Sequence, residues 1–78
     1  MVWGMLAKEL RKARKETGMT QEQLAAASGL DVTYISQIER GLRNPSLDVF
    51  FRLCKGLQIR PRTLIARLEK AMGWPREA

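Results

Sequence analysis

Residues 32–40 carry several short polar side chains and few charged ones. Such side chains can form hydrogen bonds with a partner surface that comes close to the helix. Wound as a helix at about 100° per residue, the stretch has a core-facing side and an outward side. The core-facing side consists of Tyr34, Ile35 and Ile38. The outward side consists of Val32, Thr33, Ser36, Gln37 and Arg40. An ordinary solvated face more often carries several Lys and Glu residues. We therefore interpret the outward side as a surface that fits a groove, with a plain solvent-exposed face as the simpler alternative.

Two short helices position this surface. The first is predicted over residues 21–28, with Thr20 as N-cap and Gln23 completing a capping box, and Gly29 ends it. The second starts with Asp31 as N-cap, continues to Arg40 and stops at Gly41. Two helices joined by a short turn that contains glycine form the helix-turn-helix layout, whose second helix enters the DNA major groove.

Three further helices are predicted around this pair, and no stretch alternates with the period of a strand. They cover about residues 2–17, 46–57 and 61–72. Their apolar stripes are Val2, Leu6, Leu10 and Ala13; Leu47, Phe50, Leu53, Cys54 and Leu57; and Leu64, Ile65, Leu68 and Met72. We expect an all-α, five-helix fold in which residues 1–78 form a single domain, with the helix-turn-helix at about 20–40. Cys54 is expected to be a packed thiol.

The amino-acid composition excludes several classes of function. The 78 residues include 14 Lys and Arg against 8 Asp and Glu, one cysteine and no histidine. This excludes a disulfide scaffold and a zinc finger and removes the usual general base, so we expect no enzyme, no metal and no cofactor. No signal peptide and no membrane-spanning run are evident, which favours a cytoplasmic protein with no membrane partner, and DNA binding would associate it with the nucleoid. The net charge of +6 makes polyanions the first partners to consider.

Three motifs in order resemble the Cro/phage-repressor (xenobiotic-response-element) helix-turn-helix family. They are Thr-Gln-x-x-Leu-Ala at 20–25, Tyr-Ile-Ser-x-Ile-Glu-x-Gly at 34–41 and Asn-Pro-Ser-Leu at 44–47. The resemblance covers about residues 5–66 and implies a lambda-repressor-like DNA-binding domain. In size the chain is similar to the controller proteins of restriction–modification systems.

The resemblance also implies roles for individual residues. The implied base contacts are Val32, Thr33, Ser36 and Gln37, the neutral members of the outward side. The implied phosphate contacts are Gln21, Arg40, Arg43 and Asn44. Arg14 and Glu39 are implied to form a structural pair. The chain departs from several relatives at Val32, where they have Gln or Arg, so base reading there would be apolar.

These observations predict a transcriptional regulator that binds double-stranded DNA, such as a prokaryotic or phage repressor. One recognition helix discriminates poorly, so we expect a homodimer on a (pseudo)palindromic operator. The helix at 61–72 is the expected dimerisation element. The interface candidates are Phe51, Leu68, Met72 and Trp74. The alternative is an antitoxin or interaction module that binds a protein partner and binds DNA only secondarily.

Overall fold

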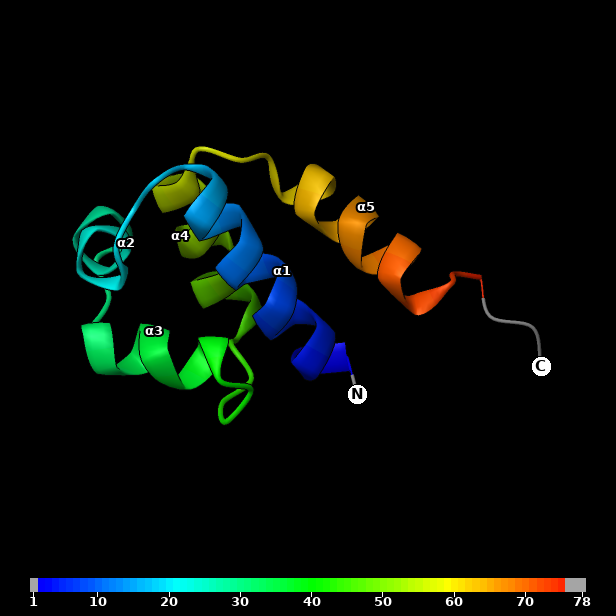
Figure 1. Cartoon of the computed structure of the whole chain (residues 1–78), viewed down its shortest axis with the longest axis horizontal. Coiled ribbons are helices and arrows are strands. Elements are labelled where there is room, and N and C mark those ends of the chain that lie inside the picture. Colours follow the sequence, from blue (N-terminus) through cyan, green and yellow to red (C-terminus); the bar gives the residue numbers. More distant parts are fainter. Residues whose placement is uncertain (1, 76–78) are drawn as a thin grey trace.

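The computed structural model describes residues 2–75, apart from the side chain of Val2, and these residues form five α-helices (Figure 1). The helices are α1 (Val2–Glu16), α2 (Gln21–Ser28), α3 (Val32–Glu39), α4 (Leu47–Leu57) and α5 (Pro61–Met72). The all-α, five-helix prediction is confirmed. Val2, predicted for the first apolar stripe, has its side chain outside the described part of the chain.

The helix starts follow from side-chain caps. The Thr20 hydroxyl accepts a hydrogen bond from the Gln23 backbone N–H at 3.0 Å, and the Thr20 N–H donates to Gln23 Oε1 at 2.8 Å. This is the predicted capping box, which satisfies backbone donors that a helix leaves free. Asp31 caps α3 by accepting from the Thr33 N–H at 2.8 Å. Ser46 caps α4 through Val49, so α4 begins one residue later than predicted.

The end of α3 is a tight left-handed turn. The helix ends at Glu39, one residue before the predicted limit, and Gly41 has φ of 72°. The Leu42 N–H donates to Gln37 O at 2.9 Å and the Gly41 N–H to Ile38 O at 3.0 Å. This is the Schellman pattern, in which glycine adopts a conformation that costs other residues strain. The turn sends the chain sharply away from the end of α3.

The core lies where α1, α2, α3 and α4 converge, and α5 closes it from the side of α1 and α4. In Figure 1, α2 and α3 occupy one end of the molecule and α5 occupies the other. Helices α2 and α4 approach closely at Gly56, where an added Cβ would lie 2.4 Å from Ser28 Oγ. That hydroxyl is buried and has no hydrogen-bond partner among the described residues. Cys54 packs in the core as predicted, and burial raises the pKa of its thiol to about 11.

Two predicted positions of apolar side chains are wrong. Leu47 and Ile65 were placed on core-facing stripes, but they are 69% and 43% exposed. Leu47 lies in the first turn of α4, beyond the reach of the core, and Ile65 lies beside the buried stripe of α5. Leu68 lies on the buried stripe of α5 as predicted and is only 6% exposed because it packs into the core of its own chain, while its place in a subunit interface stays a prediction. It has little surface left for a second subunit.

Candidate nucleic-acid interface

The outward side of α3 is a short surface of small side chains on a firmly anchored helix. Ile35 and Ile38 are almost completely buried, which fixes the rotation of α3 about its own axis. On the opposite side Val32 and Thr33 are exposed, and Ser36 and Gln37 are half-buried. The structure thus brings the four predicted base-contacting residues onto one face, and the exposed Arg40 follows at its C-terminal end.

A buried ion pair joins α1 to this helix. Arg14 Nε lies 2.6 Å from Glu39 Oε2, and Arg14 Nη2 donates to Glu39 Oε1 at 2.9 Å. The two side chains are only 11% and 3% exposed. The hydrogen bond to Glu39 raises the pKa of Arg14 further above its ordinary value. The two parallel bonds form a bidentate contact, which fixes orientation as well as distance.

The same carboxylate also ties in α2. Gln21 Nε2 donates to Glu39 Oε1 at 3.2 Å, and Arg14 Nη1 donates to the Met19 carbonyl oxygen at 2.9 Å. Arg14, Gln21 and Glu39 therefore form one polar cluster at the junction of α1, α2 and α3. The predicted phosphate contact Gln21 and the predicted structural pair meet in this cluster. It holds the start of α2 in a fixed position relative to the outward side of α3.

The turn after α3 presents two arginines and an amide. Arg40, Arg43 and Asn44 are all exposed. The guanidinium carbon of Arg43 lies 5.1 Å from the ring centroid of Tyr34, a cation–π distance. The sequence patterns do not predict this contact. The helical wheel assigned Tyr34 to the core-facing side, and the position of Arg43 depends on the path of the chain after Gly41, which the wheel does not describe.

The remaining predicted residues lie away from this surface. Phe51 on α4 is 49% exposed, Trp74 after α5 is 61% exposed, and Met72 is half-buried. Within residues 2–75, no three Cys, Asp or Glu side chains gather closely enough to hold a metal ion. None of the described helices combines the length and the apolar character needed to cross a membrane.

Known proteins share this arrangement. The model of the family described as "Helix-turn-helix" matches residues 10–64. Control protein C.BamHI of Bacillus amyloliquefaciens is 38% identical over 65 residues, which cover 83% of this chain and 78% of that protein. An uncharacterized HTH-type transcriptional regulator of Mycobacterium tuberculosis is 40% identical over 58 residues, 74% of this chain. The chain spans only 41% of the length of that relative.

Solved structures agree with the sequence matches. The wild-type restriction–modification controller protein C.Esp1396I superposes with a TM-score of 0.88 at 38% identity, covering 92% of this chain and 94% of that one. The same protein, solved as a tetramer in complex with its natural 35 base-pair operator, gives a TM-score of 0.86 over 90% of this chain and 92% of that one. The chain belongs to the Cro/phage-repressor helix-turn-helix family, with close similarity to restriction–modification controller proteins.

Proposed function

We propose that this protein is a transcriptional regulator that binds a specific double-stranded operator, with α3 in the major groove. The observation that carries the proposal is the outward side of α3, a face of small hydrogen-bonding and methyl groups on a helix fixed by two buried isoleucines. The operator complex of the similar protein C.Esp1396I supports it. Regulators of this family are not enzymes, so binding is the proposed activity. It would take place in the cytoplasm, at the nucleoid.

The outward side of α3 offers two kinds of base contact. The Gln37 amide has a donor and an acceptor side by side, which match N7 and N6 of adenine. The methyl groups of Val32 and Thr33 suit the methyl group of thymine. Val32 is exposed at the first position of α3, which leaves it free to pack against a base. We therefore expect A·T pairs to dominate the half-site that α3 reads.

Contacts to the DNA backbone would flank this reading surface. Gln21 lies at the start of α2, where free backbone N–H groups attract phosphate. Arg40, Arg43 and Asn44 lie in and after the turn that ends α3. The Tyr34 ring restricts Arg43 before binding, which reduces the entropy lost when the guanidinium contacts a phosphate.

The finer proposal is a homodimer on a pseudopalindromic operator. Two recognition helices about 34 Å apart would read half-sites one turn of DNA apart. The exposed aromatic side chains Phe51 and Trp74, together with the half-buried Met72, are the candidates for the subunit contact. A sedimentation experiment tests this part. A monomer at micromolar concentration, both free and on operator DNA, would rule the dimer out.

The experiment that tests the function is selection of bound duplexes from a random pool. We expect an inverted repeat with half-site centres about 10 base pairs apart. We expect the selected duplex to bind at least about a thousandfold more tightly than random duplex at physiological salt. Recovery of sequences no different from the starting pool would contradict a role as a specific regulator.

A further inference from the structure

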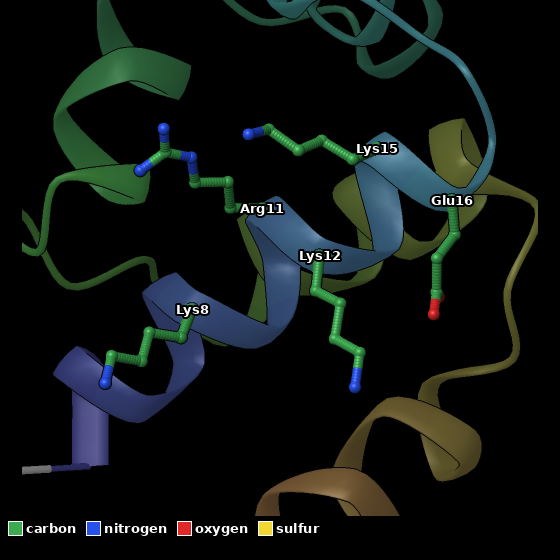
Figure 2. A pocket seen from close by; sticks show the side chains of 5 residues that line it. All are labelled: Lys8, Arg11, Lys12, Lys15 and Glu16. Atoms are coloured by element: carbon green, nitrogen blue, oxygen red, sulfur yellow. The ribbon is translucent and has the colours of Figure 1, made fainter.

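The outer face of α1 carries a compact group of cations, Lys8, Arg11, Lys12 and Lys15, which we call the basic face. Figure 2 shows these side chains, with Glu16, around an open hollow on α1. All four are exposed, and none forms an ion pair with any residue between 2 and 75. Their spacing of three and four residues places them on one side of the helix, over a length of about 10 Å.

This arrangement is unfavourable for the free protein. Lys8–Lys12 and Arg11–Lys15 are like charges four residues apart, and Lys8–Arg11 and Lys12–Lys15 are three apart. Such pairs destabilise a helix, whereas opposite charges at the same spacing stabilise it. In contrast, Glu16, at the edge of the hollow, is bound by Arg67 of α5 at 2.9 Å. Lys12 also has Glu9 and Glu16 at three- and four-residue spacing, so the unbalanced positive charge of the basic face lies on Lys8, Arg11 and Lys15.

The basic face extends around α1 from the side of α3 to the side of α5. Arg14 is the α1 residue that reaches α3, through Glu39. On the helical wheel Arg11 lies about 60° around α1 from Arg14, whereas Lys8, Lys12 and Lys15 lie about 100–160° from it. In Figure 2, Arg11 and Lys15 extend toward the side of α3, whereas Lys12 and Glu16 extend toward α5. A duplex docked against α3 would leave the part of the basic face around Lys12 uncovered.

The hollow itself favours one kind of ligand. Its walls are the aliphatic stems of the lysine and arginine side chains, with the charged groups at the rim. The phosphate backbone of a nucleic acid would contact only the charged groups at the rim. A helix that carries carboxylates at three- and four-residue spacing, with an apolar side chain between them, would use both the rim and the walls.

We propose that the basic face of α1 docks an acidic amphipathic helix of a partner protein while α3 remains free to bind DNA. A second copy of this chain does not fit, because it also carries +6 and each helix from α2 to α5 has one acidic residue. Of the two acidic residues on α1, Glu16 is already bound to Arg67. The inference goes beyond the proposed function and does not depend on it.

The test uses the isotope-labelled full chain and a synthetic helical peptide with glutamates at three- and four-residue spacing around one leucine. NMR titration should shift the amides of residues 8–15, both in the free protein and in its complex with the selected duplex. Changing the four cations to glutamine (Lys8→Gln, Arg11→Gln, Lys12→Gln and Lys15→Gln, the basic-face variant) should weaken peptide binding at least about tenfold. Replacing the peptide glutamates by glutamine should have the same effect.

A matched variant controls for net charge. It removes four exposed cations elsewhere, by Lys55→Gln, Arg60→Gln, Arg62→Gln and Lys70→Gln. Equal weakening in the two variants, or shifts centred on α3, would overturn the proposal. A selected duplex with long flanks that shifts the amides of residues 8–15 and blocks the peptide would also overturn it, because the face would then bind DNA. Failure to select any duplex would leave the titration of the free protein valid, so the two proposals fail separately.

Discussion

The solvent-facing sides of α1 and α3 are made of opposite kinds of side chain. The outer face of α1 has four long, flexible cations, whereas the outward side of α3 has four short neutral residues. A flexible cation senses the charge of a partner but not its pattern of donors and acceptors. A short amide or hydroxyl on a fixed helix can distinguish that pattern. Most of the charge and the proposed sequence reading therefore lie on different helices.

The ion pair between Arg14 and Glu39 holds α1 and α3 in a fixed position relative to each other. Arg14→Ala leaves a nearly buried carboxylate without its partner, and we expect a loss of about 3 kcal/mol in the free energy of unfolding. Urea denaturation measures it. Arg67→Ala removes an exposed pair with Glu16 and should cost less than about 1 kcal/mol. Similar losses in the two variants would contradict the special role of the buried pair.

Substitution of Gln37 is the sharpest test of base recognition by α3. Gln37→Ala should cost about 1–3 kcal/mol on the selected operator and little on random duplex, because the amide pairs with a base edge. Fluorescence anisotropy on the two duplexes gives both values. An equal loss on both would remove Gln37 from the set of base-contacting residues.

Arg43 should contribute to DNA binding through its charge and not through recognition of a base. Arg43→Ala is expected to weaken binding to operator and random duplex alike, and to reduce the slope of log K against log salt by about one unit. Arg43→Lys keeps the charge but not the flat stacking on Tyr34, so the slope should remain while affinity falls slightly. Loss of discrimination without a change of slope would place Arg43 among the base-contacting residues.

The smallest expected effect concerns repulsion within the basic face. Lys8→Gln relieves the like-charge contacts with Arg11 and Lys12, has no Asp or Glu three or four residues away on α1 to lose, and should raise the free energy of unfolding by about 0.5 kcal/mol at low salt. The gain should vanish at high salt, because screening removes it. Thermal denaturation at two salt concentrations checks both statements. A destabilised variant would show that Lys8 already has a favourable contact.

Much of the fold could be predicted from local sequence because its signals are local. Thr20, Asp31 and Ser46 cap helices through backbone groups two or three residues away, and the period of leucines and alanines identifies the buried sides. The errors at Leu47 and Ile65 have another origin. A wheel shows which side of a helix is apolar, but which positions along that side meet another helix depends on tertiary packing.

The candidate site likewise has a part that local sequence predicts and a part that it does not. The face of Val32, Thr33, Ser36 and Gln37 follows from the winding of one helix, so spacing alone identified it. The contacts Gln21–Glu39 and Arg43–Tyr34 join residues of different elements, and no local pattern encodes them. The four cations of the basic face can be read from the sequence, but that none of them forms an ion pair within residues 2–75 required the structure.

Repeating the selection from the random duplex pool with the basic-face variant and with Gln37→Ala tests the central claim most directly. The account predicts that the basic-face variant recovers the same half-site as the wild-type protein, even if its affinity is lower. It predicts that Gln37→Ala loses the preference at one position of each half-site. An unchanged half-site with Gln37→Ala, or an altered one with the basic-face variant, would contradict the assignment of sequence reading to α3.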